Sequence, residues 1–289
     1  MDVRGEIKKG AVRPVKSLGQ NFLTDELVAG RIVEAAELTK EDVVIEVGPG
    51  LGALTALICE KAGQVIAVEI DRHLIPRISA NMAEHGNFEL IHDDILKIPF
   101  DELYRRVAQT GCKRVKVLSN LPYYITTAVM MRFFEESPQP DKMVFMMQRE
   151  VADRLVAKPS TKAYGSLTVL TNYYAQPHRA FYVAPHCFVP QPDVESAVVV
   201  LDIRDVPPVP VPDKTFFFGV VRAAFAQRRK TLVNCLISAG LIPKDRVFAE
   251  ELFAKAGIDV RARGESLTMS EFATLTDLLY FNIPNRNQD

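Results

Sequence analysis

Short apolar runs alternate with helix-like segments through the first two hundred residues, and this alternation most limits what the chain can fold into. The pattern is typical of parallel strands that are buried on both faces and joined by helices. We expect strands at Val43–Val47, Val65–Ile70, Phe88–Ile91, Val115–Leu118 and Met143–Met147. Two later runs, Leu167–Tyr174 and Ala197–Ile203, lack a clear helix between them and are interpreted as an antiparallel pair at one sheet edge. The predicted class is α/β.

The composition changes at residues 205–213, where recurring prolines favour an extended, semi-rigid connection. Beyond this linker the pattern is helical, and we expect helices at Phe216–Phe225, Lys230–Ser238, Asp245–Ala256 and Ser270–Phe281. Thr268 and Glu271 have the spacing of a capping box for the last helix. The predicted organisation is a first domain at residues 1–204, the linker at 205–213 and a small all-helical domain at 214–289.

A chain of 289 residues with 48% hydrophobic content can bury the core of one or two domains. Residues 1–16 lack the apolar stretch of a signal segment, and no run approaches the roughly 18 apolar residues that a membrane span requires. We therefore expect a cytoplasmic protein that does not enter a membrane. The four cysteines lie far apart and form no C-x-x-C pair, so neither a metal site nor a disulfide framework is indicated.

The net charge of −1 does not favour a generic polyanion binder. The charge is nevertheless uneven along the chain. Residues 1–20 hold five Lys or Arg against two Asp or Glu, and residues 214–289 hold eleven against eight. Both a basic rim around an acidic site and an unevenly charged solvated surface fit this distribution.

A glycine loop, Gly48–Thr55, follows the first predicted strand and allows the backbone to turn tightly against a ligand before a helix begins. Three interpretations of this loop stay open. With Ala53 in the sixth place it satisfies the dinucleotide fingerprint, and with Gly52 it satisfies the tighter glycine pattern of methyl-donor enzymes. A plain strand-to-helix turn is the third reading.

Carboxylates stand at the ends of the next two predicted strands. Glu69 lies nineteen residues after Gly50, near the spacing at which a carboxylate accepts hydrogen bonds from two ribose hydroxyls. Asp94 follows the third strand and is expected to accept from the adenine amine of a cofactor. Each acid alone would fit a surface position or a helix cap, but the two at successive strand ends favour a bound nucleoside.

The tetrapeptide Asn120-Leu121-Pro122-Tyr123 follows the apolar run Val115–Leu118. An amide, a carbonyl, a rigid proline and an aromatic ring at a strand end can hold a flat base that bears an exocyclic amine. Hydride transfer needs a proton donor or acceptor beside the substrate, whereas methyl transfer from a sulfonium needs mainly alignment. None of the five histidines falls at an obvious site, so the pattern favours methylation of a base amine over a dehydrogenase.

The chemistry of an exocyclic amine assigns roles within this tetrapeptide. The nitrogen lone pair is delocalised into the ring, and hydrogen bonds accepted from both N–H groups pull the nitrogen toward tetrahedral geometry. The side-chain oxygen of Asn120 and the main-chain oxygen of Leu121 are the expected acceptors. Pro122 fixes the backbone, and Tyr123 is expected to stack on a flipped or unpaired base.

With these motifs in place, the chain resembles the ribosomal RNA adenine N6,N6-dimethyltransferases of the small ribosomal subunit over nearly its whole length. Beyond the glycine loop and the Asn-Leu-Pro-Tyr tetrapeptide, four long segments carry the resemblance: Lys16–Leu23, Gln148–Leu155, Phe188–Ser196 and Phe225–Leu232. It implies a Rossmann-like class I methyltransferase sheet with a small helical C-terminal domain.

The resemblance also implies a reaction. S-adenosylmethionine would donate methyl groups to two adjacent adenosines near the 3′ end of small-subunit (16S) rRNA in an assembling subunit, leaving S-adenosylhomocysteine. Carried over by motif, the cofactor contacts are Asn21, Leu23, Gly48, Gly50, Glu69, Asp94 and Asn120. Tyr123 and Phe188 would sandwich the adenine, and Arg228, Arg229 and Lys230 of the helical domain would meet rRNA. No metal is implied, and a monomer is the expectation.

Three other functions remain as alternatives. A large-subunit rRNA methylase that confers antibiotic resistance shares the loop and the tetrapeptide, but the linker and the Arg228–Leu232 stretch look like the small-subunit enzyme. A non-catalytic assembly or RNA-binding factor would not need Asn120, Glu69 and Asp94, all of which are intact. A nicotinamide dehydrogenase comes third.

Overall fold

The computed structural model describes residue 5, residues 14–15 and residues 18–282. Most of the basic N-terminal stretch, including Lys16 and Ser17, lies outside the described residues, as does the end of the chain from residue 283. Contacts between α-carbons divide the chain into two compact units, which we describe separately. The first contains the chain up to Ala152 together with Gln176–Ile203, and the second contains Asp153–Ala175 and the chain from Arg204.

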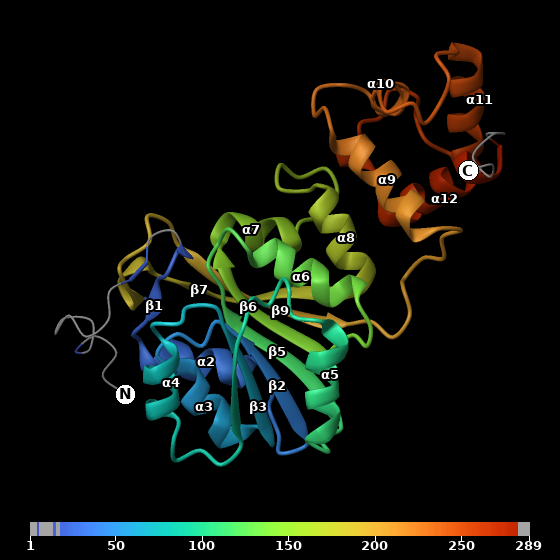
Figure 1. Cartoon of the computed structure of the whole chain (residues 1–289). Coiled ribbons are helices and arrows are strands. Elements are labelled where there is room, and N and C mark those ends of the chain that lie inside the picture. Colours follow the sequence, from blue (N-terminus) through green and yellow to red (C-terminus); the bar gives the residue numbers. More distant parts are fainter. Residues whose placement is uncertain (1–4, 6–13, 16–17, 283–289) are drawn as a thin grey trace. The chain divides into compact units, whose positions relative to one another are not determined.

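The first unit is built on a seven-stranded sheet with the order β4-β3-β2-β5-β6-β9-β7 (Figure 1). Its strands are β2 (Asp42–Val47), β3 (Gln64–Glu69), β4 (Phe88–His92), β5 (Arg114–Asn120), β6 (Lys142–Gln148), β7 (Ala175–Val183) and β9 (Ser196–Ile203). Strands β2 to β6 are parallel, and β9 pairs with β6 in the antiparallel sense. The α/β class and the five parallel strands are confirmed, each within a few residues of its predicted bounds.

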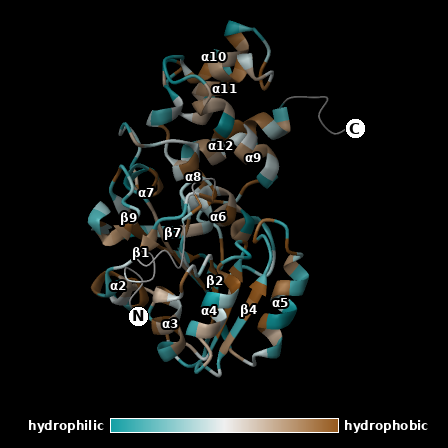
Figure 2. Ribbon diagram, turned by 60° about the vertical axis from the view of Figure 1, so that its left-hand side comes forward, coloured by the Kyte–Doolittle hydropathy of each residue, from teal (hydrophilic) through white to brown (hydrophobic). Residues whose placement is uncertain are grey.

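Helices cover both faces of this sheet. Figure 1 shows α2 (Glu26–Ala35), α3 (Ala53–Lys61) and α4 (Ile75–Asn81) on one side, and α5 (Phe100–Gln109) and α6 (Thr126–Glu135) on the other. Every residue of β2 is buried, as expected for a strand with both faces covered. Helix α5 buries Phe100, Leu103, Tyr104 and Val107, which recur at helical spacing, and Figure 2 shows its hydrophobic and hydrophilic sides.

The predicted strand at Leu167–Tyr174 is wrong, because Ser166–Tyr174 is the helix α8. A short run such as Leu167–Tyr174, in which Thr168, Thr171 and Asn172 interrupt the apolar residues, has no periodicity that separates a strand from a buried helix. The Gly165 N–H donates to Thr168 Oγ1 at 3.1 Å and fixes the helix start. The strand β7 follows immediately. It was not predicted, because most of its side chains are exposed and some are charged, so it does not stand out as an apolar run.

The second unit corrects one part of the predicted domain division. Residues 153–175, which the sequence analysis assigned to the first domain, belong to the helical unit. Tyr173 and Tyr174 of α8 pack on Phe218, with ring centroids 5.2 and 5.8 Å apart. Tyr164 donates a hydrogen bond to the Leu267 carbonyl at 2.8 Å. Packing between aromatic residues from distant parts of the chain therefore assigns residues 153–175 to the second unit. The local composition does not indicate this assignment.

The rest of the second unit follows the prediction. Its helices are α9 (Lys214–Phe225), α10 (Leu232–Ser238), α11 (Arg246–Ala256) and α12 (Met269–Asn282), and residues 204–213 form neither helix nor strand. Thr268 and Glu271 form the predicted capping box: the Thr268 N–H donates to Glu271 Oε2 at 2.7 Å, and the Glu271 N–H donates to Thr268 Oγ1 at 3.3 Å. Among the described residues, no helix combines the length and apolar character that a membrane crossing needs.

Candidate functional site

The glycine loop leads from β2 into α3, and three of its glycines have positive φ, at 68° for Gly48, 60° for Gly50 and 91° for Gly52. These values favour glycine strongly over other residues. A β-carbon on Gly52 would lie 2.6 Å from Ile78 Cδ1, so the loop is also closely packed against α4. The backbone is thereby held in a tight turn at the carboxyl end of β2.

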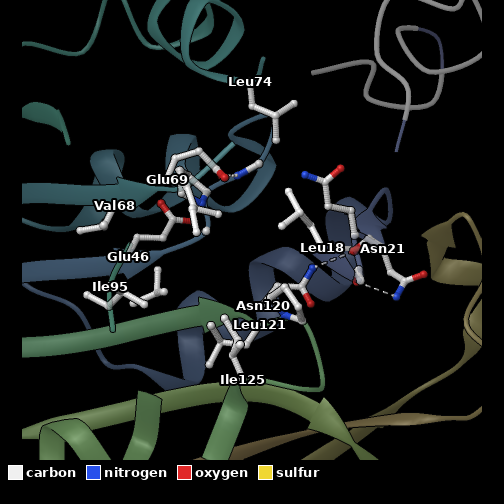
Figure 3. Close-up of a pocket in the computed structure, with 18 of the residues that line it drawn as sticks. Leu18, Asn21, Glu46, Val68, Glu69, Leu74, Ile95, Asn120, Leu121 and Ile125 are labelled. Carbon is white, nitrogen blue, oxygen red and sulfur yellow. Dashed lines mark hydrogen bonds between the residues drawn. The ribbon is translucent and has the colours of Figure 1, made fainter. Parts of the chain in front are cut away.

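A cavity of about 240 Å³ opens at the carboxyl ends of β2, β3 and β5 (Figure 3). The glycine loop forms one wall, and residues 18–23, which include the short strand β1 (Phe22–Leu23), form another. Ten of the residues singled out in the sequence line this cavity: Asn21, Leu23, Gly48, Gly50, Glu69, Asp94, Asn120, Leu121, Pro122 and Tyr123. The fold thus collects at one place side chains that are spread over a hundred residues of sequence.

Glu69 is the last residue of β3, and Asp94 lies two residues beyond the end of β4. The Glu69 carboxylate accepts from the Gly50 N–H at 3.2 Å and from the Asp71 N–H at 2.9 Å, and burial raises its pKa. The Asp94 carboxylate accepts from the Leu96 N–H at 2.9 Å and lies 3.5 Å from Lys97 Nζ. Both carboxylates are held in place by backbone donors before any ligand arrives.

Glu46, which was not predicted as a site residue, also lines the cavity (Figure 3). Its side chain is 2% exposed, and Glu46 Oε2 has no hydrogen-bond partner among the described residues. Burial, together with the nearby Glu69 carboxylate, raises the pKa of Glu46 to about 8. An acid inside the otherwise apolar run Val43–Val47, two residues before Gly48, was the available signal.

The Asn-Leu-Pro-Tyr turn follows β5. Asn120 Nδ2 donates to the Asn21 main-chain oxygen at 3.2 Å, which sets the orientation of the amide (Figure 3). The Pro122 carbonyl accepts from the Ile125 N–H at 3.2 Å and from Thr126 Oγ1 at 3.3 Å, so the turn runs directly into α6. The tetrapeptide is therefore anchored at both ends.

The two aromatic residues expected around the base are placed differently. Tyr123 lines the cavity, and its hydroxyl lies 2.8 Å from Ser196 Oγ. Phe188 does not line the cavity: it is 1% exposed, lies in the hydrophobic core and pairs with Leu23 between β1 and β8 (Phe188–Val189). Tyr124, which is 62% exposed, lines the cavity instead.

The basic cluster Arg228-Arg229-Lys230 follows α9 in the second unit, and all three residues are exposed. Arg228 is engaged within its own unit, because it donates to the Lys162 carbonyl and its Nε lies 3.7 Å from Glu265 Oε2. These contacts hold the Arg228 side chain against its own unit.

This sheet, with its glycine loop, strand-end carboxylates and Asn-Leu-Pro-Tyr turn, defines a Rossmann-like class I methyltransferase. The dimethyladenosine transferase of Plasmodium falciparum has the same fold, with a TM-score of 0.76 at 23% identity over 90% of this chain and 97% of that one. The chain belongs to the ribosomal RNA adenine dimethylase family, whose model matches residues 13–279.

Two other proteins bear on the choice within this family. Ribosomal RNA small subunit methyltransferase A of Clostridium acetobutylicum is 44% identical over 96% of this chain and 98% of its own length. The 23S rRNA methyltransferase ErmE is 26% identical, with a TM-score of 0.68, over 90% of this chain and all of that one. The chain is thus more similar to the small-subunit enzyme.

Proposed function

We propose that the chain transfers methyl groups from S-adenosylmethionine to the exocyclic amines of two adjacent adenosines near the 3′ end of small-subunit rRNA. The observation that carries this proposal is the single cavity that joins the glycine loop, Glu69 and Asp94 to the Asn-Leu-Pro-Tyr turn. The 44% identity with the small-subunit methyltransferase, against 26% with ErmE, supports the small subunit as the substrate.

The residues that line the cavity fit a positively charged nucleoside cofactor. Glu69 and Asp94 would accept from the ribose hydroxyls and from the adenine amine, and Asn21 and Leu23 would close the site from the N-terminal side. Glu46 supplies a buried carboxylate oxygen that has no hydrogen-bond partner in the described part of the chain, and such an oxygen suits a cation. When bound, S-adenosylmethionine supplies a methyl group made electrophilic by its sulfonium.

The chain's own contribution to the reaction is alignment of the amine. Asn120 Oδ1 and the Leu121 carbonyl would accept hydrogen bonds from the two N–H groups of the target adenine, which frees the nitrogen lone pair for attack. The Tyr123 ring would stack on the base, and its hydroxyl bond to Ser196 holds the ring in place. The product ammonium is acidic and loses its proton to water, so no strong general base is needed.

Phe188 was expected to sandwich the adenine together with Tyr123, but it is not among the residues that line the cavity. In the described fold Phe188 is a buried core residue. Tyr124 already lines the cavity and is exposed. We propose that Tyr123 supplies the stacking surface, and that a second aromatic face is completed only when RNA binds.

We further propose that the substrate is an assembling small subunit, that the chain acts as a monomer in the cytoplasm, and that Arg229 and Lys230 contact rRNA. The net charge of −1 supports recognition through local basic positions rather than through overall charge. A role restricted to assembly, without catalysis, is disfavoured because the cavity keeps all the predicted cofactor contacts together.

The test is transfer of labelled methyl groups from S-adenosylmethionine to small ribosomal subunits that lack the modification, with large subunits as a parallel substrate. Dimethyladenosine near the 3′ end of small-subunit rRNA is the expected product. Label in large-subunit rRNA would select the resistance methylase, and cofactor binding without label in either would favour a binding role.

The variant Asn120→Ala tests the role of the Asn120 side chain in the same assay. It is expected to lower methyl transfer by about 100-fold or more, because the amine loses one of its two acceptors and its alignment. Binding to the particle should stay near that of the unchanged protein, as measured by sedimentation. Retained activity would refute the role of the Asn120 amide.

A further inference from the structure

One arginine of α6, Arg132, joins this helix to the loop that carries Asp94. Its Nη1 and Nη2 atoms donate to the main-chain oxygens of Ile95 and Ile98. Its Nε donates to Glu136 Oε1 at 2.8 Å. The Arg132 side chain is only 12% exposed, so these hydrogen bonds are largely shielded from water. All of these residues belong to the first unit.

The same arginine packs on an aromatic ring at the start of α5. Its guanidinium carbon lies 5.4 Å from the centroid of the Phe100 ring, and that ring packs on Phe133 with centroids 5.5 Å apart. Both phenylalanines are buried, and Figure 1 shows α5 and α6 on the same side of the sheet. The attraction of a cation to a ring face adds to the hydrogen bonds and limits the other positions that the guanidinium can take.

The loop that accepts these hydrogen bonds is a tight turn. The Ile98 N–H donates to the Asp94 carbonyl at 2.9 Å, and the Leu96 N–H donates to the Asp94 carboxylate at 2.9 Å. Asp94, Ile95 and Leu96 line the cavity, and Figure 3 labels Ile95 there. The two donors from Arg132 therefore hold, from the side of α6, the turn that orients the Asp94 carboxylate.

Helix α6 also begins at the place where the target amine is expected. The Asn-Leu-Pro-Tyr turn runs directly into this helix, because the Ile125 N–H and Thr126 Oγ1 both donate to the Pro122 carbonyl. Arg132 lies further along the same helix. A single helix thus joins the residues that would align the amine to the residue that holds the Asp94 turn.

Methyl transfer requires a close match between the positions of the cofactor and the amine, since a misplacement of about 1 Å can lower a rate by about 100-fold. Asp94 is expected to accept a hydrogen bond from the adenine amine of the cofactor. We propose that Arg132 is a positioning residue, which holds the Asp94 turn in the geometry that recognises this amine and so selects an adenine cofactor. The inference rests on the proposed function, because it assumes that the adenine lies against Asp94.

The experiment measures, by calorimetry, the affinity of the full chain for S-adenosylhomocysteine and for its purine analogue, in which a hydrogen replaces the adenine amine. The unchanged protein is expected to bind the adenine form about 10-fold or more tightly, which is the effect of one hydrogen bond to a charged group. In Arg132→Met the turn loses its donors from α6, and this ratio of affinities should fall to about 3-fold or less.

Arg132→Lys is the second variant, for the case that Arg132→Met does not fold. A lysine keeps the charge but lacks the fixed planar fork that donates to the Ile95 and Ile98 carbonyls together. The ratio of affinities should therefore fall in Arg132→Lys as well, by a smaller factor. A loosening of the whole fold would lower both affinities together and leave their ratio unchanged.

Lys40→Met is the matched control. Lys40 Nζ donates to the carbonyls of Glu60 and Ala62, both at 2.9 Å, so Lys40 is also a cation that binds main-chain oxygens. These carbonyls lie at the carboxyl end of α3, whereas the glycine loop leads into the other end of that helix. Lys40→Met is therefore expected to keep the ratio of the unchanged protein.

Three results would overturn the proposal: an unchanged ratio in the Arg132 variants, an equal fall of the ratio in Lys40→Met, or equal binding of the two ligands by the unchanged protein. Methyl transfer to small ribosomal subunits is measured separately on the unchanged protein. If the adenine form is preferred and Arg132→Met loses this preference, but no methyl group is transferred, the proposed reaction fails and the positioning role of Arg132 stands.

Discussion

At the scale of single residues, the cavity holds two carboxylates under conditions that disfavour their charged forms. Glu46 is 2% exposed and Glu69 is 3% exposed, and burial raises the pKa of both. A bound cation would reverse this penalty, since an opposite charge nearby favours the ionised carboxylate. A positively charged ligand is thus expected to stabilise the protein at neutral pH.

The pH dependence of stability follows from Glu46. The raised pKa keeps this proton on Glu46 in the folded protein up to pH about 8, whereas the unfolded chain loses it near the ordinary glutamate pKa of 4.5. Between these values the folded state binds more protons, so the free energy of unfolding falls as pH rises, by up to about 1.4 kcal/mol per pH unit. The decline should level off above pH 8. In Glu46→Gln, which cannot titrate, the decline should be shallower.

Urea denaturation of both proteins without cofactor, at several pH values between about 5 and 8, measures this difference. Glu69 contributes in the same direction in both proteins, so the comparison isolates Glu46. Equal slopes for Glu46→Gln and the unchanged protein would show that the Glu46 carboxylate ionises normally in the fold.

At the scale of elements, the glycines of this loop allow the cost of backbone strain to be measured apart from the cost of steric crowding. Gly52 has φ 91° and no room for a β-carbon, whereas Gly48 has φ 68° with nothing within 4 Å of the β-carbon position. Gly86 also has open space there, and its φ lies outside the positive range. The three positions therefore differ by one physical effect at a time.

Alanine substitutions are expected to rank accordingly. Gly48→Ala should destabilise by roughly 1 kcal/mol through strain, and Gly52→Ala by roughly 2 to 4 kcal/mol, because Ile78 and Met82 must also shift. Gly86→Ala serves as the control and should be close to neutral. Denaturant midpoints measure the series, and a Gly52→Ala effect no larger than that of Gly48→Ala would argue against crowding by α4.

The elements also show what the sequence could predict. Four of the five parallel strands, β2, β3, β5 and β6, are mostly buried, which leaves a mainly apolar run in the sequence. Glu69, Asp94 and Asn120 follow from strand ends. Residues 166–174 form α8 rather than a strand, because packing on distant aromatic residues decides a run that local pattern leaves ambiguous. The burial of Phe188 likewise could not be predicted from the sequence, since its core neighbours come from distant parts of the chain.

At the scale of the whole molecule, the second unit depends on aromatic packing between separated segments. Tyr173 is 3% exposed and contacts Tyr174, Phe217 and Phe218, with ring centroids 5.2 to 5.6 Å apart. Its neighbours on α9 lie beyond the proline-rich linker in sequence. This packing ties residues 153–175 to the helices that follow residue 204.

Tyr173→Ala is expected to destabilise the protein by roughly 3 to 5 kcal/mol, the cost of removing a large buried ring. Tyr124→Ala is the control: Tyr124 is 62% exposed, so its loss should change stability little. Thermal unfolding followed by circular dichroism measures both variants. A Tyr173→Ala effect below that of Tyr124→Ala would contradict the packing described for the second unit.

The interleaving of the two units constrains how the chain is made and how it can be divided. Residues 153–175 leave the translating ribosome before Phe217 and Phe218 exist, while β9 of the first unit follows them. Neither unit is a continuous stretch of sequence, so the nascent chain carries an unfinished aromatic surface until α9 has been synthesised. A protease cut in the proline-rich linker would leave α8 on the N-terminal fragment, separated in sequence from its partners. Expression of either unit alone therefore requires a rejoined chain rather than a truncation.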